Sequence, residues 1–417
     1  MPALTPIFLV ALTATLTVRL WLAVRQLHHV RLHQDRVPEP FTADISLPVH
    51  RKAADYTAAK VRLSLLSTLL DSVLVLVWTL GGGLATLDDA WRGAHLGALN
   101  TGVLVIASFV LINAAISLPL SLYSTFGIEA DFGFNRTSVK TYVADILKTL
   151  LLAALLGVPL LFAALALMAR AGRLWWLYVW ALWFGFSLIM TWAYPRFIAP
   201  LFNKFSPLAD EGLKARIETL LARCGFTSKG VFVMDGSTRS AHGNAYFTGF
   251  GANKRIVFFD TLMEKLEPAE IEAVLAHELG HFRLKHVIQR LVLTAVLGLT
   301  ALWLLGWLAD QDWFYTALGV PAPSDYTALL LFTLLLPPFL FFFEPLASAW
   351  SRRHEFQADA YARKQADGGA LVRALVKLYR DNASTLTPDP LHSAFYDSHP
   401  PALLRIARLQ APTDAAS

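Results

Sequence analysis

Two histidines stand four residues apart in the segment AHELGHFRLKH (Ala276–His286), and a glutamate directly follows the first. On a helix, residues i and i+4 share a face, so His277 and His281 can bind one metal ion together. Glu278 is rotated by about 100° from His277 and can instead reach a water molecule on the metal. Gly280 would let another backbone or a substrate approach closely. The competing interpretation is three polar residues on a solvated helix face.

A catalytic zinc site needs a third protein ligand and keeps a fourth position open. The segment SRRHEFQADAYA offers Glu355, while His354 and His286 are rival candidates. We favour Glu355 because Asp359 follows it by one turn, where a carboxylate can accept the N–H of a ligating histidine and fix its tautomer. The alternative is a solvated helix face on which both carboxylates pair with neighbouring arginines.

The composition indicates a membrane protein. Of the 417 residues, 55% are hydrophobic and only 16% are charged, which is too apolar for a water-soluble surface. The single cysteine, Cys224, excludes an internal disulfide framework and a cysteine-rich metal site. The sequence pI is near 9.2, but the basic residues lie beside apolar runs, which favours membrane topology over nucleic-acid binding.

Seven apolar stretches are long enough to cross a bilayer, which takes about 20 helical residues. They lie at Pro6–Val24, Ser64–Leu87, Leu96–Tyr123, Thr149–Ala169, Leu174–Pro195, Leu291–Ala309 and Tyr326–Trp350. No basic residue precedes the first stretch and several follow it, which is the opposite of a secretory signal. We therefore expect it to be a retained span.

Loop charges predict the orientation in the membrane. The Arg25–Arg62 loop has seven Lys and Arg against four acidic residues, whereas the Asp310–Asp325 loop has three Asp and no Lys or Arg. Basic loops stay on the cytoplasmic side, so the N-terminus is expected outside and the C-terminus inside. The Arg170–Arg173 hairpin runs against this arrangement, because it places two arginines outside.

A polar insert and a polar tail fall on the same predicted side of the membrane. We expect residues 1–195 to hold the first five spans, 196–289 to form a catalytic insert, 290–350 to hold the last two spans, and 351–417 to complete the catalytic domain. Within the insert, the sequence predicts helices over Ala209–Cys224 and from Pro268, and strands over Val231–Asp235, Ala245–Phe250 and Arg255–Asp260. The expected fold is an all-α polytopic membrane protein with a small α+β domain on the cytoplasmic side.

Two acidic residues fall inside predicted spans, Asp71 in the second and Glu344 in the seventh. Such charges usually face the protein interior or a water-filled cavity. Glu344 precedes Glu355 by about three helical turns, so on an unbroken helix both would share a face. The alternative is that Glu344 lies at the membrane interface and pairs with Arg352 or Arg353.

Six further segments, together with HELGH, resemble the CAAX prenyl protease 1 family of integral-membrane zinc endopeptidases. They occur in the family's order as FGFNRTS (Phe132–Ser138), PLFNKFSPL (Pro200–Leu208), HGNAYFTGF (His242–Phe250), KRIVFFDTL (Lys254–Leu262), SRRHEFQADAYA (Ser351–Ala362) and SHPPALLRI (Ser398–Ile406). The resemblance covers nearly the whole chain. It implies seven tilted helices around a water-filled intramembrane chamber, with a zinc domain capping the inner end.

The resemblance also implies a role for each matching residue. One Zn²⁺ per chain would be held by His277, His281 and Glu355, with Glu278 as general base. The remaining matches are Asp359 as the carboxylate behind a ligand, His399 and Arg405 as the pair that stabilises the oxyanion, and Asn244, Ala245, Tyr246 and Phe247 in the substrate cleft. Taken alone, His399 is equally typical of a surface histidine at the rigid turn before Pro400 and Pro401.

The segment Asn244–Phe250 has two interpretations. As an edge strand it could pair with an extended peptide backbone, which is the role that the resemblance implies. As an interior strand of the small sheet it would have no free edge.

The expected function is an integral-membrane zinc endopeptidase that acts on membrane-associated peptides or proteins, with the lipid bilayer as a partner and no nucleic acid. An intramembrane protease of the site-2 type is disfavoured, because its motif lies inside a span, whereas HELGH precedes the sixth. The other alternative is a transporter or channel with a structural zinc, but such sites are usually closed by four protein ligands. The Ala-, Leu- and Arg-rich composition suggests a bacterial inner membrane. The natural substrate, cleavage of prenylated CAAX peptides and the oligomeric state stay open.

Overall fold

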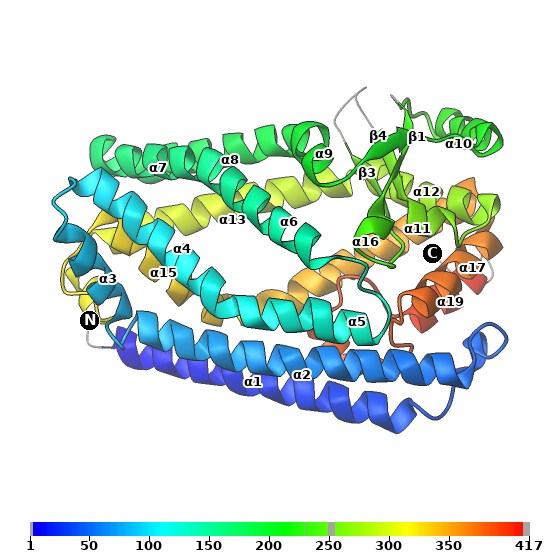
Figure 1. Ribbon diagram of the computed structural model, residues 1–417, viewed down its shortest axis with the longest axis horizontal. Coiled ribbons are helices and arrows are strands. Elements are labelled where there is room, and N and C mark those ends of the chain that lie inside the picture. The colour runs from blue at the N-terminus through cyan, green and yellow to red at the C-terminus, as the bar shows by residue number, and fades with distance from the viewer. Residues whose placement is uncertain (1–2, 229, 249–254, 412–417) are drawn as a thin grey trace.

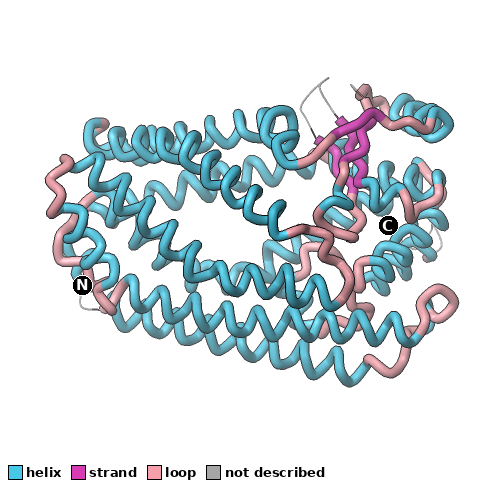
Figure 2. The backbone as a smooth tube through the Cα atoms, in the orientation of Figure 1, coloured by secondary structure: helices cyan, strands magenta, loops and turns pink. Residues whose placement is uncertain are grey.

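The computed structural model describes residues 3–228, 230–248 and 255–411. Long helices form one elongated part of the molecule, and a small sheet with short helices lies at one end of it (Figures 1 and 2). The predicted class, a helical membrane protein with a small α+β domain, is confirmed for the described chain.

Seven helical segments of the described chain are long and apolar enough to cross a membrane. They are α1 (Leu4–His33), α2 (Leu47–Trp78), α4 (Ala98–Leu122) continued to Asp131 through α5 (Glu129–Asp131), α6 (Val139–Leu152) with α7 (Val158–Arg170), α8 (Trp175–Ala193) with α9 (Ala199–Phe202), α13 (His286–Ala309), and α15 (Asp325–Leu340) with α16 (Glu344–Gln365). The protein is therefore a multi-pass membrane protein, as predicted.

The end predicted for the second span is wrong. Its helix stops at Trp78, and a separate helix, α3 (Gly83–Arg92), follows. Between them lie Gly81 and Gly82, and Gly82 adopts a left-handed φ of 74°. Glycine reaches this conformation without the penalty that a side chain imposes, so the chain turns here instead of extending the helix to Leu87.

The predicted Arg25–Arg62 loop is also mostly helical, because α1 runs to His33 and α2 begins at Leu47. These extensions reach the C-terminal segment of the chain. Arg25 on α1 donates to the carboxylate of Asp389, and its Nη2 lies 2.9 Å from Oδ2. One of the basic residues that predicted the orientation therefore also fastens α1 to the C-terminal segment.

The seventh span is the central one. About 56% of its most apolar window is buried inside the protein, whereas the other six windows are only 6–22% buried. In Figure 1, α1 and α2 run side by side along one flank of α15, and α7, α8 and α13 lie along the other. The seventh span therefore supplies the core of the bundle, and the other six spans lie around it with most of their apolar windows accessible.

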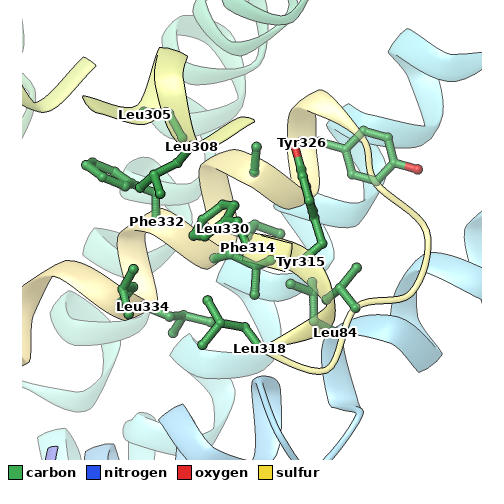
Figure 3. Packing of buried hydrophobic residues seen from close by; sticks show 14 of the residues in the cluster. Leu84, Leu305, Leu308, Phe314, Tyr315, Leu318, Tyr326, Leu330, Phe332 and Leu334 are labelled. Atoms are coloured by element: carbon green, nitrogen blue, oxygen red, sulfur yellow. The ribbon is translucent and has the colours of Figure 1, made fainter. Parts of the chain in front are cut away.

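A buried apolar cluster, part of which Figure 3 shows, lies at the end of the bundle that is remote from the sheet in Figure 1. It joins Leu84 of α3, Leu305 of α13, Phe314 of α14 (Asp312–Thr316) and Leu330 of α15. The cluster fixes the spacing of four chain segments far from the small sheet.

The small sheet has the order β1-β2-β4-β3. Its strands are β1 (Phe205–Pro207), β2 (Val231–Met234), β3 (Ala245–Thr248) and β4 (Arg255–Phe259), and only the β2–β4 pair is parallel. The three predicted strands are confirmed, but β2 and β4 end one residue earlier than predicted, before Asp235 and Asp260, and Gly249 and Phe250 lie outside the described residues. The three-residue β1 had no recognisable pattern in the sequence.

Strand β3 lies at an edge of this described sheet, because it pairs with β4 alone. The predicted edge position is therefore confirmed within the described residues, where the interior-strand alternative is wrong, and pairing with a peptide stays a prediction.

Helix α12 (Pro268–Arg283) is the centre of the small domain. It packs against α16 and α17 (Gly368–Asp381) from the C-terminal tail and against α10 (Glu211–Arg223) from the insert. The helix begins at Pro268, as predicted, and a capping box between Glu267 and Glu270 stabilises its first turn. The insert and the tail therefore form one packed unit.

Glu344 begins α16, the same unbroken helix that carries Glu355. Its carboxylate lies 3.5 Å from Nη2 of Arg19 on α1. The alternative partner Arg352 donates instead to the backbone carbonyls of Ser393, Ala394 and Asp397, so the pairing with it is wrong. The other intramembrane acid, Asp71, is exposed, with its Oδ2 3.4 Å from the Ser67 hydroxyl.

Candidate metal centre

Helices α12 and α16 touch at Gly280. A Cβ atom at this position would lie 3.0 Å from Cα of Ala358 and 3.2 Å from its carbonyl oxygen, closer than side chains normally tolerate. The glycine therefore allows the two backbones to approach, as predicted. This contact lies one turn from Glu355 along α16 and brings that residue to the histidines of α12.

Three potential ligand atoms converge between the two helices. His277 Nε2 lies 3.3 Å from His281 Nε2 and 3.4 Å from Glu355 Oε2, and His281 Nε2 lies 3.4 Å from Glu355 Oε1. Zinc bonds of about 2 Å in a tetrahedron place neighbouring ligand atoms about 3.3 Å apart. The spacing of these three residues therefore fits a tetrahedral zinc ion.

The carboxylate of Glu355 supports the same interpretation. Its buried Oε2 makes no hydrogen bond within the described residues, and its nearest polar neighbours are Nε2 of His277 at 3.4 Å and Nδ1 of His399 at 2.7 Å. A buried carboxylate is stabilised by nearby positive charge, which a bound cation would supply.

The nitrogen of His277 that faces away from the other ligand atoms contacts the carboxylate of Asp359. Its Nδ1 lies 2.8 Å from Oδ1 of Asp359, so the N–H on Nδ1 donates to the carboxylate and the lone pair of Nε2 faces the other ligand atoms. Burial lowers the pKa of His277, but the carboxylates of Asp359 and Glu355 outweigh burial and raise the pKa to about 9, so a metal ion that binds Nε2 must displace a proton. The Nδ1–H contact with Asp359 is the one that the sequence argument expected to fix the tautomer of the metal-binding form.

His281 has a different environment. Its Nδ1 lies 3.0 Å from Nδ1 of His286, on the side of the ring opposite Nε2. Burial, followed by the charge of His277, lowers the pKa of His281 to about 3, so the ring is neutral near pH 7. His286 therefore lies behind a ligand, outside the triangle of ligand atoms.

The second rival ligand, His354, also lies outside this triangle. Its ring stacks on His286 with centroids 3.9 Å apart, and its Nε2 lies 3.1 Å from Oε1 of Gln289. Residues 354 and 355 are adjacent on α16, so their side chains differ in direction by about 100° and only one can face α12.

Glu278 follows His277 on α12 and is half-buried. Burial raises the pKa of the Glu278 carboxyl. The positive charge of His277 lowers this pKa, and the negative charge of Glu355 raises it further. A carboxyl with a raised pKa beside a metal site is suited to accept and return a proton.

The structure brings His399 and Arg405 to opposite sides of this centre. His399 is 65% exposed beside Glu355, on the open side. Arg405 is buried, and its Nε and Nη2 lie 2.8 and 2.5 Å from the two carboxylate oxygens of Asp359, behind His277. These contacts favour a supporting role for Arg405 over the oxyanion role that the motif implies.

The predicted cleft segment lies on the sheet edge. Asn244 is exposed and its carbonyl accepts from the amide of Phe259, while Ala245 and Tyr246 are half-buried. Strand β3 contacts α12, and its residues pair with β4 on one side only, with Phe247 opposite Ile256. The other edge is free within the described sheet.

A cavity of about 620 Å³ reaches the exposed side of the centre. Its lining includes His399, Tyr56 and Lys60 from α2, and His242 and Asn382 from the small domain. The cavity therefore lies between α2 and the small domain, beside His399.

Two protein-family models match the chain. The CAAX prenyl protease N-terminal domain, with five membrane helices, matches residues 26–204, and peptidase family M48 matches residues 207–413. The CAAX prenyl protease 1 homolog of Oryza sativa subsp. japonica is 35% identical over 401 residues, covering 94% of this chain and 93% of the relative. CAAX prenyl protease 1 of Saccharomyces cerevisiae is 32% identical, covering 93% and 91%. The crystal structure of S. mikatae Ste24p is similar with a TM-score of 0.91 and 31% identity, covering 98% of this chain and 99% of that one.

Proposed function

The chain belongs to peptidase family M48 and is an integral-membrane metallopeptidase of the CAAX prenyl protease 1 type; from this premise we propose that it is a zinc endopeptidase. The convergence of His277, His281 and Glu355, with ligand atoms 3.3–3.4 Å apart, carries the proposal. Zinc bound there supplies Lewis-acid polarisation of a peptide carbonyl and lowers the pKa of a bound water.

Each residue around the ligands has a separate role in the proposed hydrolysis. Glu278 accepts a proton from the attacking water and returns it to the leaving amine. His399, on the open side, donates an N–H to the oxygen that becomes negative during attack. Asp359 and Arg405 hold the imidazole of His277 in the orientation that hydrolysis requires.

The substrate is a peptide or protein, as for any family M48 peptidase. We propose that an extended segment pairs with the free edge of β3, at Asn244, Ala245, Tyr246 and Phe247, with main-chain hydrogen bonds giving affinity. The relatives named above are CAAX prenyl proteases, so a membrane-associated substrate with a prenylated C-terminal CAAX box is the first class to examine.

The proposed arrangement in the membrane follows the charge of the loops. Residues 1–195 and 290–350 form the membrane part, and residues 196–289 and 351–417 form one catalytic domain. That domain lies in the cytoplasm of a bacterial cell, with the N-terminus outside the inner membrane.

A transporter or channel with a structural zinc is not favoured. The peptidase family model covers the catalytic part, and only three ligands converge in the described residues, whereas structural zinc sites usually have four. Three protein ligands are the number typical of a catalytic zinc site.

The test is hydrolysis by purified protein and by Glu278→Gln, with a peptide ending in a prenylated CAAX box and the same peptide without the lipid. We expect Glu278→Gln to keep its zinc and melting temperature and to lose several orders of magnitude in rate, because it removes only the proton carrier. Glu264→Gln, on an exposed residue, is the matched control and should behave as wild type. Normal hydrolysis by Glu278→Gln would refute the mechanism, and zinc-loaded wild type without peptidase activity would favour the transporter.

A further inference from the structure

His286 is a buried histidine that the mechanism above does not use. It is 1% exposed, its Nδ1 lies 3.0 Å from His281 Nδ1, and its Nε2 lies 2.9 Å from Oε1 of Gln357 on α16. Gln357 is separated from His286 by 71 residues, so only the tertiary fold, in which α12 packs against α16, brings the two side chains together. The three side chains form one continuous line from α16 to the metal ligand.

The backbone before His286 is bent in a way that aims this side chain at His281. Helix α12 ends at Arg283 and α13 begins at His286, and Lys285 between them has a φ of 59°. A residue with a side chain adopts this left-handed conformation at an energetic cost, which the surrounding structure must offset. Here the turn returns the chain toward His281 directly after the helix that carries it.

The direction of each hydrogen bond follows from the last acceptor in the line. Oε1 of Gln357 can only accept, so His286 carries its hydrogen on Nε2 and leaves Nδ1 as an acceptor. Nδ1 of His286 then accepts the N–H on Nδ1 of His281. His281 therefore presents the lone pair of Nε2 toward His277 and Glu355, which is the form that can bind a metal ion.

We propose that His286 and Gln357 are positioning residues that fix the tautomer and ring orientation of the ligand His281. The proposal rests on the metal site of the proposed function and adds a second support to it. His277 is held by the anionic Asp359, whereas His281 is held by a neutral pair. The two histidine ligands thus differ in basicity, although the HELGH motif treats them alike.

The size of the effect follows from the exposure of each member. Residues behind a metal ligand typically change metal affinity by about 10–100-fold when they are removed. His286 is buried, so water cannot readily take its place. Gln357 is exposed on α16, so water can replace its oxygen and the loss should be smaller.

The experiment measures zinc dissociation constants by competition with a chelator, using the purified full-length protein in detergent. We expect His286→Ala to bind zinc about 10–100-fold more weakly than wild type, and Gln357→Leu to lose less. His286→Asn should recover part of the affinity, because its side-chain oxygen can accept from His281. The matched control is His354→Leu, which alters the ring stacked on His286 but removes no member of the line. The melting temperature of each zinc-free protein is measured beside the affinity.

Each outcome separates this proposal from the rest. A loss of zinc affinity in His286→Ala, with a melting temperature close to wild type and partial recovery in His286→Asn, supports the positioning role. If His286→Ala and His354→Leu lose zinc affinity equally, and their melting temperatures fall in parallel, the histidine cluster contributes only packing and the positioning role is overturned. Wild-type zinc affinity in His286→Ala also overturns it. Retention of zinc by Glu355→Ala with complete loss in His286→Ala makes His286 a ligand and also overturns it. Wild-type protein that holds no zinc refutes the proposed function itself.

Discussion

Arg405 and Asp359 form a buried bidentate ion pair. Nε of Arg405 lies 2.8 Å from Oδ2 of Asp359, and Nη2 lies 2.5 Å from Oδ1. The ion pair orients the carboxylate that accepts from His277. Removing one partner of a buried pair leaves the other uncompensated, at a cost of about 3–5 kcal/mol. We therefore expect Arg405→Ala to lower both the melting temperature and the zinc affinity, the latter by about 10–100-fold.

Arg405→Lys should recover only part of this loss, because an ammonium group lacks the planar fork that holds both carboxylate oxygens. Arg408→Ala is the matched control, since Arg408 lies one turn away on α19 (Ala402–Gln410), exposed and stacked over Phe356. Metal analysis, melting curves and kcat are measured on the same preparations. A fall in kcat alone, with normal zinc and stability, would instead return Arg405 to the oxyanion role that the sequence motif implies.

Removing the imidazole of His399 should affect the rate and leave the site intact. The side chain is 65% exposed, so His399→Ala should fold normally. The loss of one oxyanion donor costs about 10²–10³ in kcat, and the KM for the peptide should change little. Single-turnover hydrolysis with parallel zinc analysis checks this. Zinc loss that accompanies the loss of rate would show that His399 acts by supporting Glu355.

Exchanging Gly280 for alanine tests the approach of the two helices. The new Cβ would lie 3.0 Å from a backbone atom of Ala358, which no side-chain rotation can relieve. We expect Gly280→Ala to cost about 1–3 kcal/mol and to weaken zinc binding, because α16 must move away from α12 with Glu355 on it. Gly185→Ala in α8 is the control, since nothing lies within 4 Å of the added atom. Equal zinc affinity in both variants would contradict the close-contact argument.

The identity of the third ligand gives a direct prediction. Glu355→Ala should lose most of its zinc, because the variant keeps only the two histidines of the three converging ligands. His354→Ala should keep one zinc per chain, since its ring faces His286 and Trp350. Zinc analysis of the purified variants decides the matter, and the reverse pattern would make His354 the ligand.

The topology can be tested with single cysteines in a Cys224→Ala background, since Cys224 is the only native thiol and is buried. A membrane-impermeant thiol reagent added to intact cells should label Thr316→Cys in the connection between the last two spans. It should spare Glu211→Cys and Gln410→Cys in the catalytic domain until the cells are opened. Labelling of either catalytic position in intact cells would reverse the proposed orientation.

The local patterns of the sequence were sufficient for several features of this protein. The spacing of His277 and His281 on one helix is a property of the α-helix itself, and so is the direction of Glu278 beside them. Runs of apolar residues predicted the seven spans, because the thickness of a bilayer sets their length. Two spans separate the insert from the tail, so both lie on one side whichever way the chain inserts. One predicted end was wrong because of local glycines: the helix of the second span ends at Trp78 instead of Leu87.

The tertiary structure alone decided how the residues behind the ligands are arranged. His354 and Glu355 are neighbours, and which of them faces α12 depends on the rotation of α16, which the contact of Gly280 with Ala358 sets. His286 stood in the motif as a possible ligand, but the turn before it carries its ring to the far nitrogen of His281. These outcomes depend on side chains far apart in the chain, and a linear pattern does not contain the angle between two packed helices. The sequence therefore determined which residues could form the centre, and the packing of α12 against α16 determined what each one does there.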